Sequence, residues 1–246
     1  MSFLSADVCY WQGEFISARS HLNNALIPWD PPSLKALTQR TGLDAHCIGL
    51  AYLGMTDFAM GYPERARHTL AESVRDAQKV GNAQTIGHCL GVAGWLAVFM
   101  RDVNQARNLA ARTIEYCKDQ RLLFWEASGY LVDGWVLIQE GSVDEGIARV
   151  HQGIEIRCAA GAALVHTSFF AILAECHLHS GEFDKGFELI AKGLTHIAWS
   201  GECLSESELY RIRGELILAR GADIEAATLD FQRAIAVAVK QDGKLC

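Results

Sequence analysis

Proline is nearly missing from this 246-residue sequence: there are four, and three of them fall between Pro28 and Pro32. Because proline disrupts helix interiors, the rest of the chain is free to be helical. The sequence also has no block of Lys and Arg residues, and its net charge is −7. This balance argues against a nucleic-acid groove and against a patch for anionic membranes. We therefore expect neither nucleic acid nor a membrane as a partner.

The eight cysteines form no CxxC pair and stand singly in apolar stretches such as His88-Cys89-Leu90. A free cysteine is commonly a small buried hydrophobe, and unpaired cysteines are typical of a reducing compartment. The N-terminus has no basic region and no cleavage site of a signal peptide. The most apolar run, Cys89 to Met100, is too short to span a bilayer. We expect a cytoplasmic protein without disulfides.

Catalytic and cofactor motifs are also missing. The sequence has no GxxxxGK[ST] loop, and no Ser–His–Asp or Cys–His arrangement can be argued from it. We expect no enzymatic activity and no cofactor. Function must then be argued from the architecture.

A turn-like segment does recur along the chain. Its first residues are spaced by 48, 40, 40, 40 and 40 residues and are Gly13, Gly61, Arg101, Gly141, Gly181 and Gly221. Seven residues before each of these anchors, and five residues after each, the sequence has only Gly or Ala. Such small residues on both sides of a turn are typical of two antiparallel helices whose axes approach to about 8–10 Å. Larger apolar residues lie one turn away on the same face.

Residues at the expected helix ends agree with this pattern. Pro63 stands in a first helical turn, where its missing N–H is harmless. Ser142 and Glu145 have the spacing of a capping box. The second helix of successive units is followed by a residue suited to the left-handed conformation, except that arginine stands in one unit: Gly42, Gly81, Arg121, Gly161 and Gly201.

These observations predict a single all-α domain over residues 1–246, a right-handed α-solenoid of about six helix hairpins. The expected units are 1–27, 42–81, 82–121, 122–161, 162–201 and 202–246, with a Pro-rich loop at 28–41. No single hairpin can bury its apolar face, so each must stack on the next.

The spacing of small and large residues resembles the tetratricopeptide repeat, although that repeat has about 34 residues and its terminal proline is absent here. HEAT-type repeats match the period but not the placement of small residues.

Four blocks also resemble the C-terminal repeat region of large bacterial signalling proteins: LAYLGMTDFAMGYPERAR, GWVLIQEGSVDEGIARVHQGI, GAALVHTSFFAILAECHLHSGEFDKGF and ESELYRIRGELIL. Those proteins carry an adenylate/guanylate cyclase-type or other effector domain and an ATPase module upstream. The resemblance covers the chain from about Gly42 onward and implies a regulatory role, not catalysis by these residues.

The first helix of each hairpin should line a concave groove. The residue after each small position points into it, which gives an aromatic floor at Trp95 and Trp135 and a polar end. Aromatic and arginine side chains are common anchors of binding energy. The partner-binding residues that we predict are Met55, Phe58, Trp95, Trp135, Glu175, His179, Arg211 and Glu215. Alternatively, the helices rotate and bury both tryptophans between hairpins.

Two other patterns invite chemical interpretations. Cys176 and His179 could chelate a metal together, but a site needs about four ligands and only His166 and Cys203 are near in sequence. We expect no metal site. Glu175 and Glu215 should lie roughly 10 Å apart on adjacent hairpins, which could mimic a general acid/base pair; we expect a solvated face instead.

The sequence thus predicts a non-catalytic interaction or regulatory module. It would bind a protein or peptide segment, amphipathic and with basic residues at one end, in its groove and act on a cyclase or ATPase domain. The alternative is a small-molecule or peptide sensor with a pocket near Trp95 and Trp135. Neither end of the array carries the polar face that solenoids need. We therefore expect a fragment of a longer protein or a homo-oligomer formed through the ends.

Overall fold

The computed structural model describes residues 2–26, 38, 42–160, 167–221 and 223–243. Within these ranges it contains twelve α-helices and no strand, which confirms the expected all-α solenoid. The predicted loop at 28–41 and Gly161 lie outside the described residues, apart from Thr38. The helices are α1 (Ser2–Trp11), α2 (Phe15–Ala25), α4 (Ala45–Ala59), α5 (Pro63–Val80), α6 (Ala83–Phe99), α7 (Val103–Asp119), α8 (Leu123–Gln139), α9 (Val143–Ala159), α10 (Thr167–Ser180), α11 (Phe183–Ser200), α12 (Glu206–Ala219) and α13 (Ile224–Lys240).

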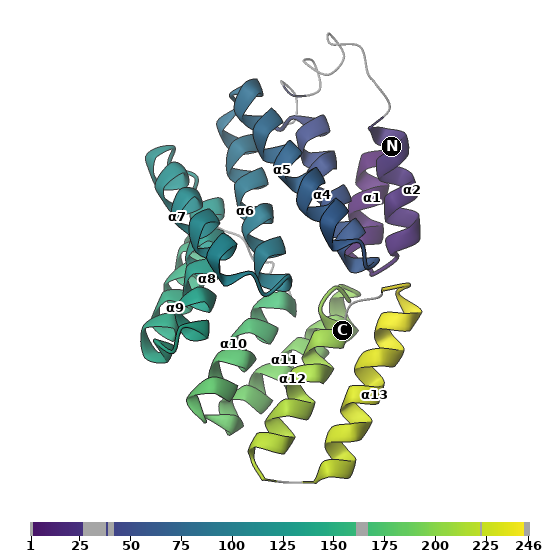
Figure 1. Cartoon of the computed structure of the whole chain (residues 1–246), viewed down its shortest axis with the longest axis vertical. Coiled ribbons are helices and arrows are strands. Elements are labelled where there is room, and N and C mark those ends of the chain that lie inside the picture. Colours follow the sequence, from purple (N-terminus) through teal and green to yellow (C-terminus); the bar gives the residue numbers. More distant parts are fainter. Residues whose placement is uncertain (1, 27–37, 39–41, 161–166, 222, 244–246) are drawn as a thin grey trace.

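The helices pair in chain order into antiparallel hairpins: α1 with α2, α4 with α5, α6 with α7, α8 with α9, α10 with α11, and α12 with α13. The first helices of neighbouring hairpins also pack on one another, as α4 does on α6 and α6 on α8. Figure 1 shows the hairpins arranged along a strongly curved path. The first helices therefore form the inner side of the array.

The turns within the hairpins depend on the left-handed backbone conformation. All six anchors have positive φ angles, from 56° at Arg101 to 89° at Gly141. Arg121 also has a positive φ, 55°, at the end of a second helix. Glycine reaches this region without a steric penalty, whereas arginine does not. The turns predicted from the sequence therefore coincide with the left-handed turns of the structure.

The small residues lie where paired helices cross. A Cβ added at Gly134 in α8 would come within 2.6 Å of the Val150 side chain and 2.8 Å of the Gly146 carbonyl oxygen, both in α9. At Gly214 in α12 it would meet the ring of Phe231 in α13 at 2.7 Å. Missing side chains thus permit the close helix packing that the spacing predicts.

Several helix starts are fixed by local hydrogen bonds. The Asp44 and Asn82 side chains accept bonds from the backbone N–H groups of Cys47 and Thr85, each at 2.9 Å, and so cap α4 and α6. Pro63 begins α5, as expected. Ser142 is the residue before α9, but its side chain makes no capping bond, so the capping-box spacing there does not produce a capping box.

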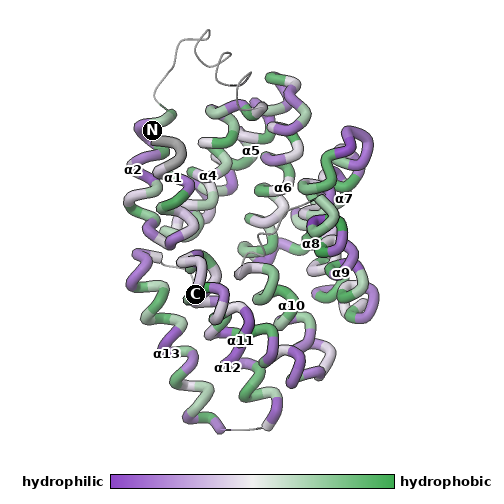
Figure 2. The backbone as a smooth tube through the Cα atoms, turned by 180° about the vertical axis from the view of Figure 1, so that it is seen from behind, coloured by the Kyte–Doolittle hydropathy of each residue, from purple (hydrophilic) through white to green (hydrophobic). Residues whose placement is uncertain are grey.

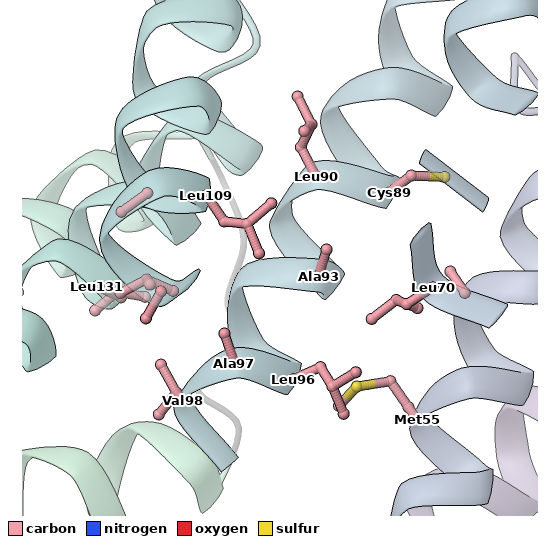
Figure 3. Packing of buried hydrophobic residues seen from close by; sticks show 14 of the residues in the cluster. Met55, Leu70, Cys89, Leu90, Ala93, Leu96, Ala97, Val98, Leu109 and Leu131 are labelled. Carbon is pink, nitrogen blue, oxygen red and sulfur yellow. The ribbon is translucent and has the colours of Figure 1, made fainter. Parts of the chain in front are cut away.

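Helix α6 lies at the centre of the main hydrophobic cluster. Figure 3 shows Leu96 directed toward Met55 of α4, while Val98 and Leu90 lie on other sides of the same helix. An inner helix such as α6 is buried on most of its circumference and is therefore apolar almost throughout. Outer helices alternate polar and apolar residues, as α13 shows in Figure 2.

The two ends of the array touch. The backbone N–H of Cys203, just before α12, donates to the carbonyl of Trp11 at the end of α1, at 2.9 Å. The Gln241 side-chain Nε2 donates to the carbonyl of Cys203, also at 2.9 Å. The first hairpin therefore rests on the last, a contact that the forty-residue period does not predict. No helix in the described ranges is long and apolar enough to cross a membrane.

Candidate functional site

The curvature of the array leaves two adjoining cavities on its inner side. The larger one, about 430 Å³, is lined by residues that include Met55, Phe58, Arg101, Trp135, Glu175, Glu208 and Arg211; we call it the central cavity. The smaller one, about 270 Å³, is lined by residues that include Tyr52, His88, Trp95, Phe124, Arg157 and Phe169; we call it the aromatic cavity. Residues common to both linings are Tyr10, Met55, Phe99, Ser168 and Leu204.

The floor of the central cavity is apolar. The rings of Phe58 and Phe99 are stacked at 6.4 Å with an interplanar angle of 19°. Trp135 is 1% exposed, and its indole Nε1 has no hydrogen-bond partner among the described residues. The Arg101 guanidinium lies 5.8 Å above the Trp135 ring, within the range of a cation–π contact.

The other end of the central cavity is a network of charges from three hairpins. Arg101, at the turn between α6 and α7, forms an ion pair with Glu175 of α10 and lies 3.5 Å from the Glu208 carboxylate of α12. Arg211 donates from Nε to Glu208 at 2.8 Å and from Nη1 to Glu215 at 2.5 Å. Burial is the largest single influence on the pKa of Arg211 and lowers it, but the hydrogen bonds to Glu208 and the negative charges of Glu208, Glu215 and Glu175 together raise the pKa above its usual value. Three carboxylates face two guanidinium groups, so the network has an excess of negative charge.

The aromatic cavity is built from rings on five helices. Trp95 of α6 lies 5.6 Å from Phe169 of α10, and the His88 imidazole lies 4.5 Å from Trp125 of α8. Burial lowers the pKa of His88 to about 3, so its ring is neutral at physiological pH. Its Nε2 has no hydrogen-bond partner among the described residues.

The side chain of Arg157 lies among these rings. The Arg157 guanidinium, from α9, is 4.0 Å from the ring centre of Phe124 and 4.8 Å from that of Phe169. Arg157 is 5% exposed, and burial lowers its pKa to about 10. A guanidinium is seldom buried without a carboxylate, which makes this position unusual.

The structure distributes the predicted groove residues over both cavities. Met55, Phe58, Trp135, Glu175 and Arg211 line the central cavity, whereas Trp95 lines the aromatic cavity. The predicted aromatic floor is therefore divided. Glu215 lines neither cavity and is connected to the first only through its ion pair with Arg211. His179 is exposed and lines neither.

The positions of the candidate side chains give little support to the metal interpretation or to the acid/base interpretation. Within the described ranges, no three His, Cys, Asp or Glu side chains are placed to share a metal ion. Cys176 is buried in the core, and His166 lies outside the described residues. Glu175 and Glu215 are each bound to an arginine. Their arrangement is that of an ion-pair network.

Sequence reasoning missed Arg101, Glu208, His88 and Arg157 as cavity residues. Arg101 had a visible signal, because it replaces glycine at a turn anchor. Arg157 had a stronger one: sixteen residues after each anchor the sequence otherwise has an apolar residue. Those residues are Trp29, Ala77, Cys117, Ile197 and Val237. A charged residue at a position that is apolar in the other hairpins departs from the packing pattern of the repeat. Such departures are often found at functional sites.

Three solved structures share this architecture. The apo form of RapI aligns with a TM-score of 0.65 at 11% identity, over 98% of this chain and 83% of that chain. The Rap conjugation gene regulator of the plasmid pLS20, in complex with the Phr* peptide, aligns with a TM-score of 0.65 at 12% identity, over 98% of this chain and 73% of that one. BtubC (BKLC) from P. vanneervenii aligns with a TM-score of 0.55 at 13% identity, over 94% of both chains. No family model matches the sequence, and no curated protein does. At these identities the likeness establishes a tetratricopeptide-like helical fold and nothing finer.

Proposed function

We propose that this protein is a non-enzymatic regulatory receptor that holds a short peptide segment in its central cavity. The segment is apolar and carries one basic residue. The observation that carries the proposal is the cavity itself, which joins an apolar floor to a carboxylate-rich end on the inner side of the array. Its volume of about 430 Å³ lies within the range of ligand pockets, roughly 300–1,000 Å³.

The charge network gives the ligand's basic group a specific place. Glu208 already shares its carboxylate between Arg101 and Arg211, and the network keeps an excess negative charge. A cationic side chain beside Glu208 and Glu175 would satisfy that charge and compete with Arg101. The complex of a similar fold with the Phr* peptide supports a peptide as the ligand class.

A ligand cation that displaces Arg101 from Glu175 and Glu208 would also transmit the effect of binding to the rest of the array. Arg101 connects the α6–α7 turn to α10 and α12, so its release loosens the contact between the middle and the end of the array. Ligand binding that favours one arrangement of the hairpins shifts the population toward it. We propose that this change is read by an effector, a cyclase or ATPase domain, for which the four sequence blocks described above are the support.

Two matched peptide pools test the binding proposal. One pool contains pentapeptides with a single arginine among apolar residues, and the other has citrulline, its neutral isostere, in the same places. We expect the arginine pool to raise the melting temperature and the citrulline pool to raise it clearly less. Glu208→Gln should remove most of the difference. Glu188→Gln is the control, because Glu188 is an exposed residue of α11 that pairs only with Lys192 among the described residues, at 2.6 Å. Equal responses to both pools, or an unchanged preference in Glu208→Gln, would overturn the proposal.

A small-molecule sensor remains the second candidate function. The observation that favours it is the aromatic cavity beside Trp95, whose volume of about 270 Å³ suits a small ring better than a peptide. The two functions are compatible because each uses a different one of the two adjoining cavities.

A further inference from the structure

From the aromatic cavity we infer a second binding site, in which Arg157 receives the carboxylate of an aromatic or strongly apolar acid. This site is separate from the charge network of the central cavity. It does not depend on the proposed peptide function, but it rests on the second candidate function, the small-molecule sensor, and names the class of molecule that would bind.

The first observation is a buried positive charge without a negative partner. No carboxylate oxygen in the described part of the chain lies within 4 Å of the Arg157 guanidinium. Its Nε is buried and has no hydrogen-bond partner there. The neighbouring stretch 161–166 contains no Asp or Glu in its sequence. A charge removed from water in this way is costly unless a counter-ion arrives.

The other cation–π arginines of the molecule show the contrast. Arg149, on the same helix, lies 5.5 Å over Tyr130 and pairs with Asp133 at 3.1 Å. Arg213 lies 5.0 Å over Tyr210 and pairs with Asp230 at 2.6 Å. Arg157 has the aromatic contacts but not the carboxylate. A ligand carboxylate would complete the arrangement that the protein uses elsewhere.

The second observation is the shape and chemistry of the surrounding cavity. Arg157 and His88 line it together with the rings of Trp95, Phe124 and Phe169, and the His88 Nε2 is another buried side-chain atom without a hydrogen-bond partner among the described residues. A guanidinium binds a carboxylate through two parallel N–H bonds. Aromatic walls then favour an acid whose body is itself a ring or a branched apolar group.

A cationic ligand fits these facts less well. The faces of Phe124 and Phe169 are already occupied by the Arg157 charge, which would repel a second cation. Asp7, the acidic residue of the lining, accepts a hydrogen bond from the Trp11 indole at 2.9 Å. That hydrogen bond satisfies the Asp7 carboxylate, whereas the Arg157 Nε is buried without a hydrogen-bond partner among the described residues. The group left unsatisfied is the guanidinium, so the ligand that fits the cavity is an anion.

The first experiment compares three probes of one shape on the full chain by calorimetry: 3-phenylpropanoate, its neutral amide 3-phenylpropanamide, and 3-phenylpropylamine. We expect the acid to bind about tenfold or more tightly than the amide, and the amine to bind worst. Gly-Gly-Phe as free acid and as amide forms a second pair. Tighter binding of the tripeptide acid points to a peptide C-terminus as the source of the carboxylate, and tighter binding of phenylpropanoate points to a free acid.

Variants separate this site from a structural role of the arginine. Arg157→Met should lower the affinity for phenylpropanoate by about tenfold or more, while the affinity for the amide stays the same. Arg149→Met, which removes the paired arginine on the same helix, should leave both affinities unchanged. If Arg157→Met does not fold, the Arg157 Nε–H signal of arginine-labelled protein, identified with Arg157→Lys, should shift with the acid and not with the amide. Equal affinities of acid and amide, preference for the amine, or an Arg157 signal that ignores the acid would each overturn the inference.

Discussion

Arg121 occupies a backbone conformation that suits glycine better than any other residue. Its φ is 55°, and it follows α7 at the position of the repeat where Gly81 follows α5 and Gly201 follows α11, with φ of 74° and 72°. Its side chain is exposed. The left-handed region is disfavoured by about 1–2 kcal/mol for a residue with a Cβ, and glycine avoids this strain. The residue is therefore a local departure from the repeat that should reduce stability.

We predict that Arg121→Gly stabilises the protein by about 0.5–1 kcal/mol. Relief of the strained φ exceeds the extra flexibility that glycine gives to the unfolded chain. Urea denaturation followed by circular dichroism measures the change. Arg121→Ala keeps the strain and should change stability little. A less stable Arg121→Gly protein would show that the arginine side chain contributes more than its backbone costs.

Arg101 is the second arginine with a positive φ, and its side chain explains its presence. At the equivalent turns the sequence has glycine, but only Arg101 reaches Glu175 and Glu208 across the inner side of the array. The same backbone strain is thus offset at one arginine by ion pairs within a cavity. Strained residues that persist in this way are typical of functional positions.

At the scale of helices, the small residues of the repeat are not equivalent. Gly94 and Gly134 stand forty residues apart at the same position of their hairpins. A Cβ at Gly94 would have a valine side chain as its nearest neighbour, at 3.3 Å, whereas a Cβ at Gly134 would lie 2.8 Å from the Gly146 carbonyl oxygen and 2.9 Å from the Val150 backbone nitrogen. A side chain can move aside, but two helix backbones in contact must separate.

We therefore predict opposite effects of alanine at the two positions. Gly134→Ala should destabilise the protein by about 1–3 kcal/mol because α8 and α9 are forced apart. Gly94→Ala should be neutral or should stabilise by up to about 1 kcal/mol, since alanine favours the helix. Thermal unfolding of both variants checks the pair. Equal effects would mean that α8 and α9 are packed less tightly than the structure shows.

The sequence was most informative about the turns and the helix crossings. Glycine at a fixed interval has a direct physical meaning, so Gly13 to Gly221 located the turns, and the small residues located the crossings. The site was predicted only in part. Trp95 and Trp135 lie in different cavities because the rotation of successive hairpins, which the repeat pattern does not encode, decides what their side chains meet. Arg101 contacts Glu175 and Glu208 for the same reason, at sequence separations that no local pattern reveals.

At the scale of the whole molecule, the contact between the ends changes how stability is distributed. In an open solenoid each repeat interacts only with its neighbours, so a local defect remains local. Here the turn after α1 rests on the chain before α12 and on the end of α13. A Cβ at Gly13 would lie 2.7–2.8 Å from three atoms of the Gln241 side chain, which holds Cys203. A disturbance at residue 13 should therefore be felt more than two hundred residues away.

Alanine at two turn glycines separates this coupling from backbone strain. Gly13 and Gly181 have nearly equal φ angles, 74° and 75°, but a Cβ at Gly181 has no other atom within 4 Å. Both substitutions should cost about 1–2 kcal/mol in local strain. Only Gly13→Ala should displace Gln241 and speed amide hydrogen exchange in the last turns of α13, because those amides depend on the closed arrangement. Hydrogen-exchange mass spectrometry of both variants tests this. Unchanged exchange in α13 of Gly13→Ala would show that the ends touch without stabilising each other, and the array would then behave as an open stack of hairpins.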